Sequence, residues 1–159
     1  MPQKIKEVRP PHGLTRLMMN VPIWLFRMHL GWLVGDRFLL LTHTGRKSGL
    51  RRQTFLEVLQ HDTTSDVYYV LSGWGEKADW LRNVEKTPEV IINVGHRQFH
   101  ARAMRLESEE AERAILDYAK RNPLAIRVLP RLMGYRLDGS EEDFRALARL
   151  GIVVAFHPT

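Results

Sequence analysis

The sequence has no cysteine among its 159 residues. Without thiols the chain cannot form disulfide bonds, use a thiolate nucleophile or bind a metal through sulfur. This absence is compatible with a reducing compartment, and we expect a cytoplasmic protein, with membrane association as the open alternative. No small-residue cleavage site follows the apolar stretch near the N-terminus, so the sequence does not indicate a secretory signal.

Long apolar runs are absent as well. The most apolar stretch, residues 15–34, is interrupted by four polar or helix-breaking residues, Asn20, Pro22, Arg27 and His29. It therefore falls short of the roughly 20 continuous residues that a bilayer span needs. The simplest interpretation is two helical pieces on either side of Pro22 that pack on the domain as a cap. The alternative is an apolar face that rests on a membrane surface or covers a ligand. With a basic tail before it, this stretch makes residues 1–37 a segment that precedes the expected domain at 38–159.

The motifs of several enzyme classes are also missing. There is no Gly-x-Ser-x-Gly elbow, and the glycine-flanked loop at 45–49 is too short for a Walker loop. Of the seven histidines, His96 and His100 lie four apart, but on predicted strands around a turn, where this spacing does not bring side chains together. No acid–base pair of carboxylates stands out, and no metal site is expected. These absences favour a protein in which a bound cofactor carries the chemistry.

Positive charge is in excess. Lysine and arginine number 24 against 18 aspartates and glutamates, which gives a formal net charge of +6. This balance favours an anionic partner, and charge alone fits nucleic acid, an acidic membrane surface or a polyanionic small molecule. The basic residues are not interleaved with aromatic residues in any recognised nucleic-acid-binding module. We therefore expect a small-molecule partner and no nucleic acid.

Period-two alternation of apolar and polar residues recurs along the middle of the chain and predicts strands. The predicted strands are 38–41, 51–59, 67–71, 89–94, 97–105 and 152–156, and the last is apolar on both faces and therefore central. The predicted helices are 77–86, 108–121, 123–133 and 140–150. Several strands follow one another at hairpin distance, which predicts an α+β fold with a mainly antiparallel sheet or small barrel.

One loop has the composition of an anion-binding site. The first predicted strand runs into the loop 45–49, with the sequence Gly-Arg-Lys-Ser-Gly, and Arg51 and Arg52 follow. The two glycines allow a tight turn. The guanidinium, ammonium, hydroxyl and backbone N–H groups between them suit a phosphate or a carboxylate. The alternative is a polar hairpin whose cations are simply solvated.

Together these elements resemble the deazaflavin-dependent nitroreductase family, which uses coenzyme F420 and has a split β-barrel fold. The resemblance covers about residues 38–121. It is carried by the loop at 45–49, a second glycine-containing loop at 72–75, the pattern D-W-x-x-N-x-x-x-x-P at 79–88 and the hairpin at 90–103. It implies an α+β split β-barrel of the FMN-binding type with peripheral helices. It also implies an oxidoreductase that transfers a hydride from reduced F420 to a quinone, nitroaromatic or enone acceptor.

The resemblance further implies a cofactor site. The residues that it assigns are Arg46, Lys47, Ser48, Gly49, Arg52, Ser72, Gly73, Trp74, Lys77 and Trp80. The first loop would hold the phosphodiester of the cofactor tail, with Arg52 and Lys77 near its phosphate or glutamate carboxylates. The backbone of residues 72–74 would lie along the deazaflavin ring, and Trp80 would flank or support the ring.

Two residues depart from the commoner pattern of the family. Trp74 stands where many members have a small or polar residue, and Asp79 stands where a proline often precedes the tryptophan. Both lie beside the expected ring, so the substrate preference is not carried over. The tyrosines that line the substrate pocket of some relatives have no clear counterparts here. Tyr118 and Tyr135 are the candidates for a catalytic proton donor, with core packing as the alternative for each and solvent as the other proton source.

Other functions stay open at the level of sequence. FMN could replace F420 as the cofactor within the same fold. A non-catalytic module that binds the cofactor, a fatty acid or a membrane is another alternative. Split barrels often dimerise, so a homodimer is compatible with the fold, although the sequence reveals no interface.

Overall fold

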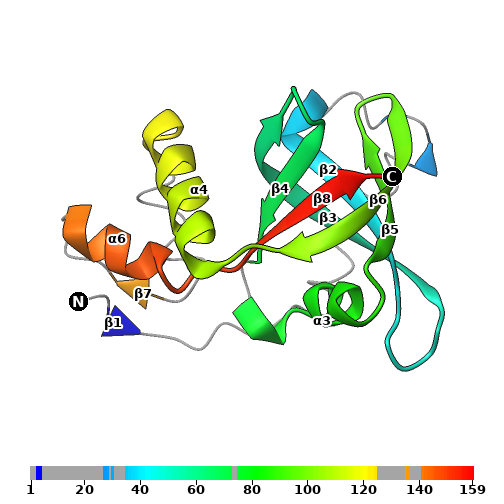
Figure 1. Cartoon of the computed structure of the whole chain (residues 1–159), viewed down its shortest axis with the longest axis horizontal. Helices are drawn as coiled ribbons and strands as arrows, with labels where there is room; N and C mark the ends of the chain where they lie inside the picture. The colour runs from blue at the N-terminus through cyan, green and yellow to red at the C-terminus, as the bar shows by residue number, and fades with distance from the viewer. Residues whose placement is uncertain are drawn as a thin grey trace.

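Six antiparallel strands close into a barrel in the computed structural model, in the order β2–β3–β4–β8–β6–β5. The structure describes residues 3–4, 27–28, 30, 35–72, 75–124, 135–136 and 141–159. The barrel strands are β2 (Phe38–Thr44), β3 (Arg51–Asp62), β4 (Val67–Leu71), β5 (Glu89–Val94), β6 (Arg97–Arg105) and β8 (Val153–Pro158). Two short strands, β1 (Gln3–Lys4) and β7 (Tyr135–Arg136), pair in a separate sheet. Figure 1 shows the barrel with helices at its side and below it.

The inner faces of the strands form the main core. On β5, Val90, Ile92 and Val94 are each 4% exposed or less and belong to this core, as their alternation predicts. Strand β8 is apolar on both faces because Phe156 points into the barrel while Val153 lies in a second cluster outside it. Pairing of β8 with β4 on one edge and β6 on the other makes it a central strand, as expected.

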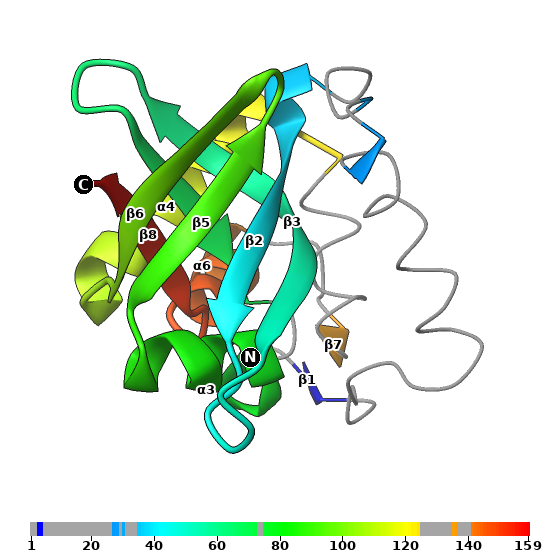
Figure 2. The ribbon, with the colours of Figure 1, turned by 90° about the vertical axis from the view of Figure 1, so that its right-hand side faces the viewer.

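Three helices cover different parts of the barrel. Helix α3 (Asp79–Lys86) places Trp80, Leu81 and Val84 in the inner core and so closes one end. Helices α4 (Ser108–Arg121) and α6 (Glu141–Ala148) pack on the outside, in a cluster that joins them to β3, β4 and β8. Figure 2 shows the loop between β2 and β3 at the end of the barrel where α3 lies. The helix that closes the barrel therefore also stands next to the candidate anion-binding loop.

The strands, the antiparallel barrel and the helix at 108–121 are confirmed. Several predicted boundaries were wrong. Strand β2 runs to Thr44 instead of 41, β8 spans Val153–Pro158 instead of 152–156, and α6 ends at Ala148 instead of 150. Strand β3 runs to Asp62 instead of 59, because a register shift between Val58 and Gln60 lets pairing continue and the His61 ring stacks on Tyr68 with centroids 3.9 Å apart. Helix α3 begins at Asp79 instead of 77, because a 3₁₀ turn, η2 (Gly75–Lys77), precedes it.

Several predictions fall on residues that the structure does not describe. They are the helix at 123–133 beyond residue 124, the start of the last helix at residue 140 and the N-terminal helical pieces. The division of the chain at residue 37 likewise stays a prediction. Among the described residues, no helix is long and apolar enough to cross a membrane.

Substitution of Phe156 tests the position of the inner core. Phe156 is 0% exposed, so Phe156→Ala should lower the free energy of unfolding by about 3–5 kcal/mol through lost apolar contacts and a cavity. Denaturant unfolding followed by circular dichroism measures the change. Met104→Ala on β6 is the control: Met104 is 54% exposed, and its loss should change stability by less than about 0.5 kcal/mol. Equal losses in the two variants would contradict this core assignment.

Candidate anion-binding site

The loop between β2 and β3 is closed by its own backbone. Gly45 N donates to Leu50 O at 2.8 Å, and Gly49 N donates to Gly45 O at 2.9 Å. Gly49 has a φ of +70°, a conformation that side chains disfavour. A Cβ at Gly45 would lie 2.8 Å from Ser48 Oγ, which is too close for an ordinary contact. The turn therefore depends on Gly49 for its backbone conformation, and a side chain at Gly45 would displace the Ser48 hydroxyl.

Side chains of helix α3 bind the backbone of this loop. Asn83 Oδ1 accepts a hydrogen bond from Arg46 N at 3.1 Å, and Lys86 Nζ donates to Arg46 O at 2.9 Å. Asp79, Asn83 and Lys86 lie four and three residues apart, so they share one helix face, while Trp80 lies on the face that enters the barrel core. The D-W-x-x-N pattern thus encodes a helix with one face for the core and another for the loop.

The side chain of Arg46 also contacts α3. Its Nη1 donates to Asn83 Oδ1 at 2.9 Å, and its Nη2 forms an ion pair with Asp79 Oδ1 at 3.0 Å. The Arg46 side chain is 23% exposed and the Asp79 side chain 72%, so this ion pair is worth no more than about 1 kcal/mol. Arg46 Nε makes no hydrogen bond with the described residues. Arg46 was expected to bind phosphate, but both of its Nη groups contact helix α3 instead.

A buried polar chain continues from the loop into the barrel. Asn83 Nδ2 lies 3.0 Å from His43 Nδ1, and His43 Nε2 lies 3.0 Å from Thr54 Oγ1. Because Asn83 Oδ1 already accepts two bonds from Arg46, its Nδ2 must donate to His43. His43 therefore accepts at Nδ1 and carries its proton at Nε2, which donates to Thr54. His43 and Asn83 are each only 4% exposed.

Burial keeps His43 neutral. Desolvation, with a contribution from the nearby Arg52 charge, lowers the pKa of His43 from 6.5 to about 4, and Asp79 opposes this only in part. Protonation at Nδ1 would also bring an N–H group against the Asn83 NH₂ group. The buried hydrogen bonds among Asn83, His43 and Thr54 therefore require that the His43 imidazole be neutral.

The outward side of the loop carries donors that have no partner among the residues the structure describes. Lys47, Ser48, Arg51 and Arg52 are exposed, and their cationic groups make no ion pair with any described residue. The backbone N–H groups of Lys47 and Ser48 likewise have no hydrogen-bond partner in the described part of the chain. Ser48 Oγ accepts from Leu50 N at 3.2 Å, which leaves its own O–H available to donate.

The second loop is only partly described. Ser72 is 1% exposed. Its N donates to Ile152 O at 2.9 Å, and its Oγ donates to Gly75 O at 2.9 Å, so Ser72 and Gly75 are fixed to each other and Ser72 to the segment before β8. Gly73 and Trp74 lie outside the described residues. Lys77 is exposed at the end of η2, directly before α3.

Trp80 lies within the inner core and is 4% exposed. Because so little of the indole is exposed, Trp80 is better placed to support the residues beneath a bound deazaflavin than to stack on the deazaflavin itself.

The candidate tyrosines lie away from the loop in the fold. Tyr118 on α4 packs in the outer cluster, and its hydroxyl donates to Glu57 Oε1 at 2.7 Å. Burial and the Glu57 carboxylate raise the pKa of Tyr118 to about 12, which makes it a weak proton donor. Tyr135 lies in β7, and its side chain is outside the described part of the structure.

Sequence reasoning missed two of the residues that hold the loop in place, His43 and Lys86. It recognised Asp79 and Asn83 as parts of a motif, but not their contacts with the loop. The signal for these contacts was present in the i, i+4 spacing of Asp79 and Asn83 on a short helix. No local pattern marks His43, because its role depends on a helix that lies 40 residues further along the chain.

Comparison with known proteins bears on the family and the fold. The family model described as F420H(2)-dependent quinone reductase matches residues 29–125. No curated protein matches the chain. Among solved structures, an F420-H2 dependent reductase, FDR-A, is 21% identical, with a TM-score of 0.54 over 77% of this chain and 96% of that one. A structure described as a domain-swapped dimer is 19% identical, with a TM-score of 0.54 over 86% and 99% of the two chains.

A third similar structure is the protein Atu2129 from Agrobacterium tumefaciens, described as of unknown function. It is 16% identical, with a TM-score of 0.54 over 96% of this chain and 58% of that one. At such low identities these likenesses bear on the fold alone, and they confirm the split β-barrel that the sequence predicts.

The low pKa of His43 predicts acid-sensitive stability. The folded-state pKa is about 4 against an ordinary value of 6.5, so the stabilisation is complete above about pH 6.5 and is lost as the pH falls toward 4. The unfolded chain takes up the proton first. Compared with His43→Asn, which does not titrate, the wild-type free energy of unfolding should fall by about 2 kcal/mol by pH 5 and about 3 kcal/mol by pH 4. Denaturant unfolding of both proteins at several pH values measures this difference, and parallel pH profiles would refute the assignment.

Proposed function

The chain belongs to the F420H(2)-dependent quinone reductase family, and we propose that its β2–β3 loop holds the charged tail of the cofactor during reduction of a quinone. Its cofactor is coenzyme F420, and it is an F420-dependent oxidoreductase. The observation that carries the proposal is the set of cations and amide N–H groups on a firmly anchored loop, for which the described part of the chain offers no partner.

The donors of the loop fit a phosphodiester. Lys47 and Arg52 supply two positive charges, and neither is neutralised by a carboxylate in the described structure. The amide N–H groups of Lys47 and Ser48 and the Ser48 hydroxyl add neutral donors from the same turn. Backbone N–H groups together with charged side chains form a favourable anion-binding concavity. The tight backbone at Gly49 fixes the spacing of these donors before a ligand arrives.

Arg46 contributes to the site in two ways in this proposal. Its contacts with Asp79 and Asn83 anchor the loop to α3. Its Nε–H, which no described residue accepts, is left for the anion. An incoming phosphate would also compete with the exposed Asp79 carboxylate for Nη2, at small cost because the ion pair is weak.

The ring end of the cofactor is proposed to lie near the second loop and η2. Ser72 and Lys77 flank the segment that leads directly into α3, so the same helix supports both loops. The buried hydrogen bonds of Ser72 give this turn a fixed position on the barrel. Gly73 and Trp74 are assigned to the ring from the sequence resemblance, and Trp80 is proposed to support the turn from within the core.

When bound, the reduced deazaflavin supplies a hydride to the acceptor. The residues of this chain position the cofactor and determine where the accompanying proton comes from. The raised pKa of Tyr118 and the commitment of its hydroxyl to Glu57 argue against Tyr118 as the donor. Solvent is therefore the proposed source, with Tyr135 as the remaining side-chain candidate.

The quinone as acceptor follows from the family, and we propose nitroaromatic and enone acceptors as a wider range for the same site.

Two further proposals concern partners. A homodimer is compatible with the fold, and one structural neighbour is described as a domain-swapped dimer. Contact with a membrane surface through residues 15–34 would give access to an apolar quinone. Sedimentation and vesicle co-pelleting of the full chain would test each in turn.

Loss of the loop cations should weaken cofactor binding. Lys47→Ala combined with Arg52→Ala removes two charged contacts to the phosphodiester and should raise the Kd for F420 roughly 30-fold or more. The fluorescence of F420 on titration with protein measures the affinity. The control combines Arg113→Ala and Lys120→Ala, which remove the same charge from exposed positions on α4 and should leave Kd within about twofold. Equal weakening by both pairs would show attraction by net charge and no site at the loop.

Replacement of the buried tyrosine should leave the reaction intact. Because the raised pKa of Tyr118 makes it a poor acid, Tyr118→Phe should retain quinone-dependent oxidation of reduced F420 within about threefold. Steady-state absorbance assays measure the rate at which reduced F420 is oxidised by a quinone, a nitroaromatic and an enone in parallel. The rates of the variant test the proton donor, and the rates of wild type define the acceptor range. A turnover rate lowered by about two orders of magnitude, with an unchanged Kd for F420, would instead identify Tyr118 as the proton donor.

A further inference from the structure

Beyond the residues that face the cofactor, we infer that His43 is a positioning residue for the anion-binding loop. Its neutral imidazole holds the Asn83 amide in the one orientation that accepts from Arg46. The inference rests on the proposed cofactor site, because the loop matters for function only where it binds the charged tail.

The buried chain of hydrogen bonds around Asn83 has a fixed set of donors and acceptors. Asn83 Oδ1 accepts from the Arg46 backbone N at 3.1 Å and from Arg46 Nη1 at 2.9 Å. Asn83 Nδ2 donates to His43 Nδ1, and His43 Nε2 donates to Thr54 Oγ1, each at 3.0 Å. Every contact joins one donor to one acceptor. No other assignment of hydrogens satisfies all of them.

Rotation of the Asn83 amide by 180° would break this match at both ends. Its NH₂ group would face two donors of Arg46, and its oxygen would face His43 Nδ1, which carries no proton in the present tautomer. Asn83 and His43 are 4% exposed, so water does not readily replace the lost partners, and each unsatisfied group is costly. The two Arg46 donors thus set the amide orientation, and His43 Nδ1 supports it by accepting from the buried NH₂ group, which keeps the loop in position.

Charged groups on every neighbouring element bear on the protonation of His43. Those that act on its pKa are Arg52 on β3, which lowers it, and Asp79 on α3, which raises it. The same neighbouring elements also carry Arg46, Lys86 and Glu89. Asp79 is engaged with Arg46, and Glu89 with Arg102 on β6. Burial and Arg52 outweigh Asp79 and keep the pKa of His43 near 4. A proton that enters at Nδ1 would remove the acceptor that Asn83 needs and release the loop from its anchored position.

The variants separate this role from ordinary packing. His43→Asn keeps an acceptor close to the position of Nδ1, because both atoms are two bonds from Cβ. His43→Leu fills similar space without an acceptor. We expect His43→Asn to bind F420 within about threefold of wild type at pH 7, and His43→Leu to bind about tenfold more weakly.

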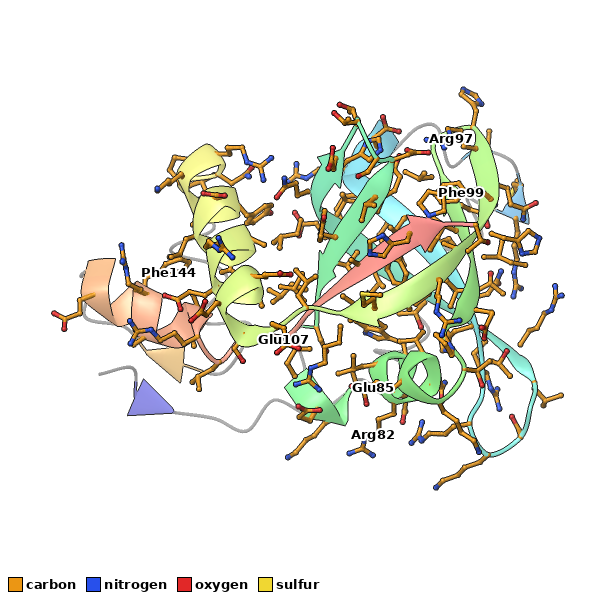
Figure 3. The ribbon with its side chains drawn as sticks, viewed as in Figure 1. Arg82, Glu85, Arg97, Phe99, Glu107 and Phe144 are labelled. Carbon is orange, nitrogen blue, oxygen red and sulfur yellow. The ribbon has the colours of Figure 1, made fainter. Side chains whose placement is uncertain are left out.

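A second histidine provides the matched control. His61 is hydrogen-bonded to Asp66 at 2.8 Å, and Asp66 also binds Arg97. Figure 3 shows Arg97 at the end of the barrel away from Arg82 and Glu85 of α3. His61→Asn therefore removes a hydrogen-bonded histidine far from the loop and should leave the Kd for F420 unchanged.

Two measurements without cofactor keep the inference separate from the proposed function. The ¹⁵N chemical shifts of the His43 ring at pH 7 should show a protonated Nε2 and an unprotonated Nδ1. Amide hydrogen exchange of Arg46 should be about tenfold faster in His43→Leu than in wild type and nearly unchanged in His43→Asn and His61→Asn.

Each outcome has a definite meaning. A proton on Nδ1, or equal Arg46 exchange in His43→Leu and wild type, would overturn the role of His43 even if F420 binds. Failure of wild type to bind F420, with the expected tautomer and exchange, would overturn the proposed cofactor site but leave the anchoring of the loop intact. Weaker binding by His43→Leu with rescue by His43→Asn would support both.

Discussion

The side-chain amide of Asn83 is the contact on which the candidate site depends. It joins three parts of the chain that are distant in sequence: the strand β2 through His43, the loop through Arg46, and its own helix α3. Because the amide is buried, its hydrogen bonds are not exchanged freely for water, and the loop has one preferred position. An anion-binding loop gains most from such fixation, since little conformational entropy is then lost when the ligand binds.

The barrel makes this arrangement possible through α3. One face of the helix, with Trp80 and Leu81, closes the inner core, and the neighbouring face binds the loop. Arg105 on β6 forms ion pairs with Glu76 before the helix and Glu85 within it, which further fix α3 to the sheet. Stability of the core and presentation of the cations are therefore coupled through one short helix. Substitutions that loosen α3 should affect both.

Much of the fold could be predicted from the sequence because its signals are local. Alternation along β5 and the apolar run of β8 follow from which faces are buried, and the glycines at 45 and 49 mark the turn. The longer reach of β3 could not be predicted, since it depends on a bulge and on the packing of His61 against Tyr68. In the site, composition indicated the anion, but not that Arg46 would turn toward Asp79 or that His43 would support the loop. Those contacts join residues that lie 33 and 40 positions apart, and no local pattern encodes them.

The central claim is that the loop between β2 and β3 binds the charged tail of F420. The most direct test follows backbone amide signals by ¹H–¹⁵N NMR while F420 is added to the full chain. The account predicts the largest shifts at Lys47 and Ser48, with a second group of shifts near Ser72 and Lys77. Saturable binding with shifts confined to α4 and α6, and none in the loop, would contradict it.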